Sequence, residues 1–200
     1  MVDVVANLAA ASARIAAACA QAGRDPGEVE LLPISKTHPA ALVRDAAAAG
    51  YRRFGESRPQ ELARRAEELA DLDLAWVAIG RVQTNKARLV AEHAAQLQSL
   101  DSLPLAEALD RRLAALGRRL PVLVQVNASG ETAKAGFTAE ELPAALDALA
   151  ALGSLDVTGL MTMAPRSDDE RVVRGCFAGL RVLRDRCRAD HPGLGQLSDR

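Results

Sequence analysis

The sequence predicts an α/β fold, and within that class a (β/α) barrel of the TIM type. First, short β-rich runs alternate with amphipathic helical segments along the 200 residues. Second, the runs are almost continuously apolar, which is typical of parallel strands joined by right-handed crossovers. Third, the runs are short and regular, which favours a barrel over an open doubly wound sheet. No G-x-G-x-x-G string follows the first run, so a dinucleotide-binding fold has little support. We expect one domain spanning residues 1–200.

The first element is an amphipathic helix predicted over residues 3–22. Its apolar stripe consists of Val4, Leu8, Ile15 and Cys19. Gly23 follows as a stop signal.

Six apolar runs then predict strands, and a seventh is a short stub. The predicted strands are 29–35, 51–55, 74–79, 96–100, 121–127 and 155–163, and the stub is 194–198. A TIM barrel has eight strands. We therefore expect a barrel that is incomplete at its C-terminus and lacks the last strand.

Prolines, glycines and capping residues mark the helices between these strands. Pro39 and Pro59 begin two helices, and Gly50, Gly117 and Gly153 end helices. Two capping boxes are predicted, Thr138 with Glu141 and Ser167 with Glu170.

Composition excludes several classes of protein. The chain is 49% hydrophobic and 26% charged with a net charge of −1, which is typical of a globular protein. With 2% aromatic residues and no basic block, it has no footprint for nucleic acid. No uncharged apolar stretch reaches about 18 residues, so we expect no membrane helix. Asp3 and the absence of a basic start argue against a secretory signal. Three widely spaced cysteines form neither a disulfide framework nor a zinc pattern, and we expect a cytoplasmic protein.

Lysine is rare in this chain. Of 25 basic residues only Lys36, Lys86 and Lys134 are lysines. A lysine amine can lose its proton and act as a nucleophile, whereas a guanidinium does not. Lys36 directly follows the first predicted strand, at the carboxyl end where α/β folds carry their chemistry. A partly desolvated amine there can form a Schiff base with an aldehyde, and pyridoxal phosphate is the commonest aldehyde cofactor. The alternatives are coding bias towards arginine and a hydrated surface lysine.

Other polar strings also follow strands. Gly55 and Gly80 each precede polar residues at a strand-to-helix bend, either for close approach to a ligand or for a tight turn. Arg81, Asn85 and Lys86 are candidates for an anion pocket, although Lys86 could equally brace a loop.

Side chains elsewhere carry weaker signals. Met161 and Met163 alternate along the last long run, as core residues or as a cofactor wall. The three histidines share no metal-ligand spacing, and His93 and His191 are expected on helix surfaces.

Together these strings resemble the pyridoxal phosphate homeostasis protein family, the alanine racemase N-terminal-domain-like family, from about residue 28 to 190. The matching strings are Ser35-Lys36-Thr37, Phe54-Gly55-Glu56, Trp76 with Ile79-Gly80, Gln83 with Asn85-Lys86, Asp101-Ser102, Gln125-Val126-Asn127, Ser129-Gly130-Glu131 with Lys134 and Gly136-Phe137, and Gly159-Leu160-Met161-Thr162-Met163-Ala164-Pro165.

The resemblance implies a monomeric, cytoplasmic carrier of pyridoxal 5'-phosphate (PLP) in vitamin B6 homeostasis, without established turnover. It implies a Schiff base on Lys36 and further cofactor-binding positions at Ser57, Asn85, Met161 and Ser198. PLP and PLP-dependent apo-enzymes are the implied partners, with no nucleic acid or membrane.

The chain departs from the family pattern in three places. Ser57 replaces a usual Asn, and Val77, Ala78 and Arg81 replace His, Phe and His. The family's Leu-Ser-Met-Gly-Met-Ser string and last strand, which supply the phosphate cradle, have only Leu197-Ser198 here. We therefore expect open sheet edges and weakened cofactor binding, with Lys36 still able to bond to the aldehyde. Two alternatives stay open: a PLP-dependent amino-acid racemase-like enzyme, for which no opposing acid or base is nominated, and a truncated remnant that no longer binds PLP well.

Overall fold

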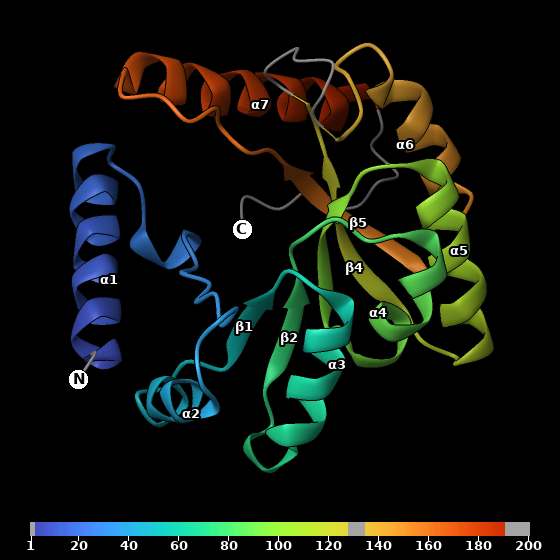
Figure 1. The fold of residues 1–200 in the computed structure, drawn as a ribbon. Helices are drawn as coiled ribbons and strands as arrows, with labels where there is room; N and C mark the ends of the chain where they lie inside the picture. Colours follow the sequence, from blue (N-terminus) through green and yellow to red (C-terminus); the bar gives the residue numbers. More distant parts are fainter. Residues whose placement is uncertain (1–2, 128–134, 191–200) are drawn as a thin grey trace.

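The computed structural model describes residues 3–127 and 135–190, and its centre is a parallel sheet (Figure 1). Its strands are β1 (Arg53–Glu56), β2 (Ala75–Ala78), β3 (Gln96–Leu100), β4 (Leu120–Gln125) and β5 (Leu155–Met161). The five strands lie in chain order and every neighbouring pair is parallel. The α/β class with parallel strands is thus confirmed. Closure into a barrel stays a prediction, because the described strands form an open sheet.

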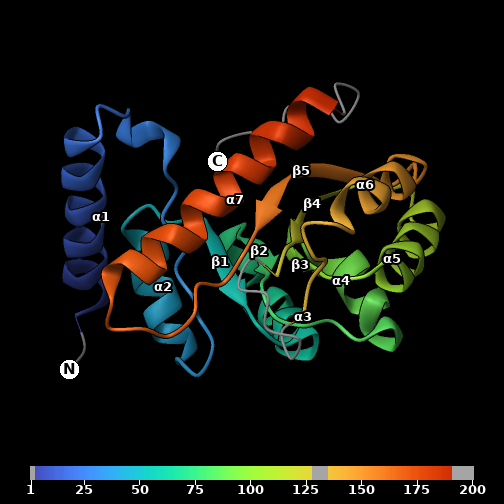
Figure 2. The same cartoon turned by 90° about the horizontal axis from the view of Figure 1, so that it is seen from above.

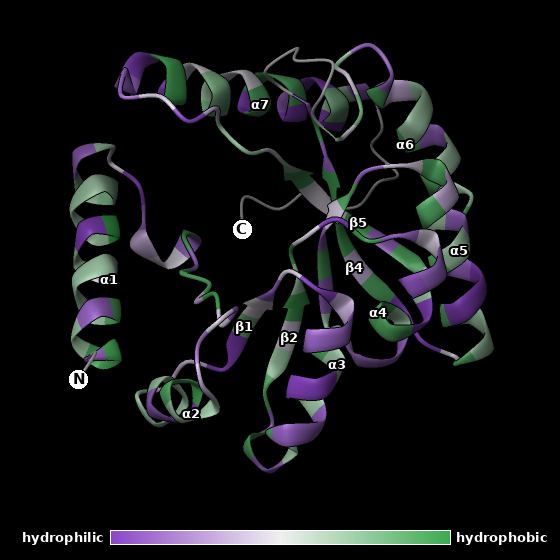
Figure 3. Cartoon of the chain, in the orientation of Figure 1, coloured by the Kyte–Doolittle hydropathy of each residue, from purple (hydrophilic) through white to green (hydrophobic). Residues whose placement is uncertain are grey.

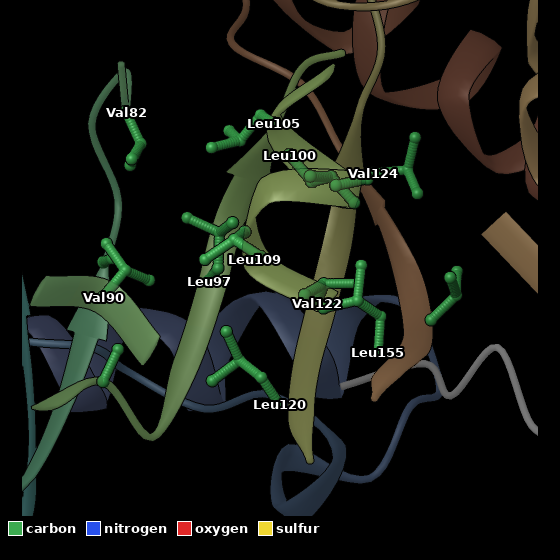
Figure 4. Packing of buried hydrophobic residues seen from close by; sticks show 14 of the residues in the cluster. Val82, Val90, Leu97, Leu100, Leu105, Leu109, Leu120, Val122, Val124 and Leu155 are labelled. Atoms are coloured by element: carbon green, nitrogen blue, oxygen red, sulfur yellow. The ribbon is translucent and has the colours of Figure 1, made fainter. Parts of the chain in front are cut away.

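Seven α-helices are described, and four of them connect successive strands of the sheet. They are α1 (Val4–Gln21), α2 (Ala40–Ala48), α3 (Pro59–Glu68), α4 (Ala87–His93), α5 (Leu103–Ala115), α6 (Leu142–Ala150) and α7 (Glu170–Asp190). In β4, Leu120, Val122 and Val124 are fully buried and their alternating neighbours are half-buried. The fully buried set packs against Leu105 and Leu109 of α5 (Figure 4). The main core therefore lies between the sheet and its helices.

The predicted strand over residues 29–35 is wrong over most of its length. Only Ile34 pairs with the sheet, as a parallel bridge to Gly55. The bonds that support it run from the Gly55 N–H to the Pro33 carbonyl (2.8 Å) and from the Ser35 N–H to the Gly55 carbonyl (3.0 Å). Pro33 has no N–H to offer, which suits the edge of a sheet. The burial expected of the apolar run is found only in part, since residues 31–33 are half-buried without strand pairing and Ile34 is 36% exposed.

The helix signals were partly right. The Thr138–Glu141 capping box is confirmed, because the Glu141 N–H donates to Thr138 Oγ1 (3.2 Å) and the Thr138 N–H donates to Glu141 Oε2 (2.9 Å). The box at Ser167 is wrong. Asp169 accepts from the Arg171 N–H (2.9 Å) at the start of α7, and Ser167 Oγ accepts from the Asp169 N–H (3.1 Å). The aspartate next to the first helical residue thus takes the capping role.

Helix α1 stands at the margin of the molecule beside α2 (Figure 2), with Cys19 as its one buried residue. Asp3 caps it by accepting from the Ala6 N–H at 2.9 Å, and its surface mixes apolar and polar residues (Figure 3). By length and composition it is apolar enough to span a membrane, although Arg14 interrupts its uncharged run. Helices of soluble proteins and N-terminal signal sequences share that composition, so it assigns no membrane location.

Candidate functional site

The sequence-predicted site residues gather along the carboxyl edge of the sheet, where the chain leaves each strand. Lys36 follows the Ile34 bridge, Ser57 follows β1, Asn85 lies in the connection after β2, and Met161 ends β5. Parallel strands bring such positions to one edge. Ser198 and Lys134 lie outside the described residues.

Lys36 occupies a tight turn. The His38 N–H donates to the Ser35 carbonyl (3.1 Å), which closes a four-residue turn with Lys36 as its second residue. Thr37, the third residue, has φ +67°, and its hydroxyl donates to the Lys36 carbonyl (2.5 Å). A positive φ in this turn position suits glycine, so a β-branched threonine there is strained. The Lys36 side chain is exposed and accessible to a ligand.

Two buried charged side chains bind the ends of this turn. Ser35 Oγ donates to Glu56 Oε1 (2.7 Å), and Glu56 is only 3% exposed. Arg65 of α3, 5% exposed, donates through Nη2 to the His38 carbonyl. The sequence analysis missed both as site residues. Phe54-Gly55-Glu56 was a signal for Glu56, but Arg65 follows an exposed Arg64 and only the fold distinguishes them.

The backbone of Ser57 lies in close contact with Gly80, which follows the end of β2. A Cβ on Gly80 would lie 2.2 Å from the Ser57 carbonyl oxygen, so this position requires glycine. Ser57 also lines a cleft of about 710 Å³ together with Arg81, Lys86 and Asp101. Arg81 Nε lies 3.7 Å from Asp101 Oδ2 across that cleft. With its other lining residues included, the cleft combines three hydroxyls, three cations and one carboxylate.

The remaining predicted residues are not drawn into that cleft. Asn85 is exposed in the 3₁₀ helix Thr84–Lys86 and does not line it. Met161 is half-buried and pairs in register with Gln125 of β4. Met163 is 67% exposed, so the two methionines do not form a shared core layer. Within residues 3–127 and 135–190, no cluster of three metal-ligating side chains is present.

A close ion pair between an arginine and an aspartate lies at the opposite, amino-terminal end of the strands. There the Arg44 guanidinium hydrogen-bonds Asp71, just before β2, and lowers the pKa of that carboxyl. Asp71 is solvent-exposed, so its pairing with Arg44 stabilises the fold only weakly.

Comparisons with known proteins point to one family. The family model described as alanine racemase, N-terminal domain, matches residues 6–193. The pyridoxal phosphate homeostasis protein of Pseudomonas aeruginosa is 44% identical over 183 residues, which cover 92% of this chain and 80% of that protein. The protein of the same name from Escherichia coli K12 is 40% identical over 192 residues, covering 91% and 82%.

Solved structures show the same fold. PipY of Synechococcus elongatus with PLP bound superposes with a TM-score of 0.78 at 37% identity, covering 90% of this chain and 84% of that one. Alanine racemase from Corynebacterium glutamicum gives a TM-score of 0.65 at 18% identity, covering 86% and 48%. The second likeness concerns the fold alone.

Proposed function

Because the chain belongs to the pyridoxal phosphate homeostasis protein family, built on the alanine racemase N-terminal domain, we propose that it binds PLP and serves intracellular vitamin B6 homeostasis. The observation that carries the proposal is the accessible amine of Lys36 on its held turn, in a chain 37% identical to a protein whose structure contains PLP.

The side chains present at the carboxyl edge fit the chemistry of the cofactor. When bound, PLP supplies an aldehyde that bonds to an amine, and Lys36 is the residue that we propose for that bond. A phosphate requires hydroxyl, amide or cationic donors. Ser57, Arg81 and Lys86 offer such donors at the same edge. Asn85, Met161 and Ser198 remain proposed contacts.

We propose binding without turnover. The relatives from Pseudomonas aeruginosa and Escherichia coli, 44% and 40% identical to this chain, bear a name for homeostasis, and the alanine racemase of Corynebacterium glutamicum shares the fold alone. An amino-acid racemase needs a second acid or base opposite the cofactor. Racemisation of alanine by the PLP-loaded protein would contradict this proposal.

The finer features of fold and setting belong to the same proposal. The strictly sequential parallel order is that of a TIM-type barrel, which supports barrel closure. The three cysteines are free thiols, which supports a reducing cytoplasm. PLP-dependent apo-enzymes are the proposed recipients of the cofactor, and the protein is proposed to be a monomer, which size-exclusion chromatography tests.

The test is a titration of the purified protein with PLP. We expect a saturable visible absorbance band, and borohydride reduction followed by peptide mapping should place the adduct on Lys36. Lys36→Ala should abolish the band, and Lys134→Ala, at a lysine with no role among the proposed contacts, is the matched control. Absence of the band, or an adduct spread over all the lysines, would refute the proposal.

A further inference from the structure

We propose that Glu56 and Arg65 are positioning residues that clamp the Lys36 turn from both ends and so present its amine to an aldehyde ligand. The inference rests on the proposed function of Lys36 but concerns residues that take no part in binding the ligand themselves. Four observations lead to it.

The first observation is where buried charge occurs. Among the residues that the structure describes, Glu56 and Arg65 are the two charged residues that are almost fully buried. Burying a charge is costly unless it is well bonded. Both bind the same four-residue turn, one at Ser35 and one at His38. The buried charges of the fold thus converge on the segment that carries Lys36.

The second observation is that each anchor is fixed from a different element. Glu56 ends β1, and its backbone carbonyl accepts from the Ile79 N–H of the next strand connection (3.0 Å). Arg65 lies in the last turn of α3, and its Nη1 lies 3.3 Å from Glu68 Oε2. The strand and the helix therefore hold the first and the fourth residue of the turn independently.

The third observation is strain at Thr37. Its φ of +67° is unfavourable for a residue with a branched Cβ. Such a conformation persists only where the surroundings determine it. With Ser35 and His38 both anchored, the clamp supplies that constraint.

The fourth observation is an incomplete bonding pattern. Arg65 Nε is buried and has no hydrogen-bond partner among the described residues. A buried cation with an unbonded donor costs stability. An arginine at this buried position is explained if its hydrogen bond to the His38 carbonyl holds the Lys36 turn in place.

The experiment compares substitutions at the two anchors with matched controls. Arg65→Met and Glu56→Leu remove the anchoring bonds. Arg64→Met changes the exposed neighbour of Arg65 on the same helix. Glu56→Gln keeps an oxygen that accepts from Ser35 Oγ. Thermal melting checks that each variant is folded.

Two readouts separate the clamp from the proposed function. Without cofactor, amide hydrogen exchange at His38 should accelerate about tenfold in Arg65→Met and Glu56→Leu, relative to amides of β4, as expected for loss of a bond to a charged group. With PLP, the affinity for adduct formation at Lys36 should fall by a similar factor. Arg64→Met and Glu56→Gln should stay within about twofold of the wild type.

The backbone strain at Thr37 allows a rescue experiment. Glycine adopts φ +67° without cost, so Thr37→Gly in the Arg65→Met background should restore part of the lost affinity. Unchanged exchange and affinity in both anchor variants would overturn the clamp. If the wild type forms no adduct at Lys36, the proposed function fails, while the exchange measurement still decides whether the clamp exists.

Discussion

Replacing Gly80 with alanine tests the closeness of two strand ends at the candidate site. The new Cβ would lie 2.2 Å from the Ser57 carbonyl oxygen and 2.9 Å from both its carbonyl carbon and its Cα. Non-bonded heavy atoms need more than about 3 Å, so the strand ends must separate by about 1 Å. All three colliding atoms are backbone, and the adjacent bond from the Ile79 N–H to the Glu56 carbonyl limits the movement.

Overpacking of this kind costs typically about 1–3 kcal/mol, and rigid backbone places Gly80→Ala in the upper half, about 2–3 kcal/mol. For a chain of this size that lowers the melting temperature by about 4–12 °C. The assay is thermal unfolding followed by circular dichroism. Gly153→Ala is the control, because its Cβ would meet no atom within 4 Å. Equal melting temperatures for the two variants would show that the close approach of Ser57 and Gly80 is not real.

Three further predictions concern packing, capping and ionisation. Leu109→Ala, at a fully buried position of α5, should cost about 2–5 kcal/mol in denaturant unfolding, whereas Leu116→Ala, 46% exposed, should cost less than about 1 kcal/mol. Thr138→Ala removes the confirmed cap and should cost about 0.5–2 kcal/mol by the same assay, and no loss would contradict the capping role. Burial raises the pKa of the Cys187 thiol, so mass spectrometry should find alkylation of half-exposed Cys176 well before Cys187 in the folded protein. Because folding favours the neutral Cys187 thiol, its contribution to stability should be complete below the unfolded pKa of about 8.5 and be lost as the pH rises through the folded value.

Local patterns predicted the fold where one signal dominated. The run 96–100 coincides with β3, and the Thr138 box forms both of its bonds. The strand predicted over residues 29–35 is wrong because an apolar run indicates contact with the core, and a segment can lie half-buried beside a sheet without forming strand hydrogen bonds. The capping box predicted at Ser167 is wrong because Asp169, two positions later, is also a capping residue. The helix begins at Glu170, directly after Asp169, so Asp169 forms the cap.

The site was predicted only in part. Lysine scarcity and position nominated Lys36, and the structure places it on an accessible turn at the sheet edge. The anchors of that turn come from residues 21 and 27 positions away from their partners, so no local string reveals them. Identical neighbours, Arg64 and Arg65, differ only in which way the helix turns them.

The strictly sequential strand order also bears on how the chain is made. Each described strand after β1 pairs with the strand synthesised immediately before it. A ribosome therefore releases each of β2 to β5 when its earlier neighbour is already available. Short separations of this kind reduce the loop-closure entropy of each pairing step. Assembly can thus proceed vectorially, with the Lys36 turn settling on β1 while the later units are still being translated.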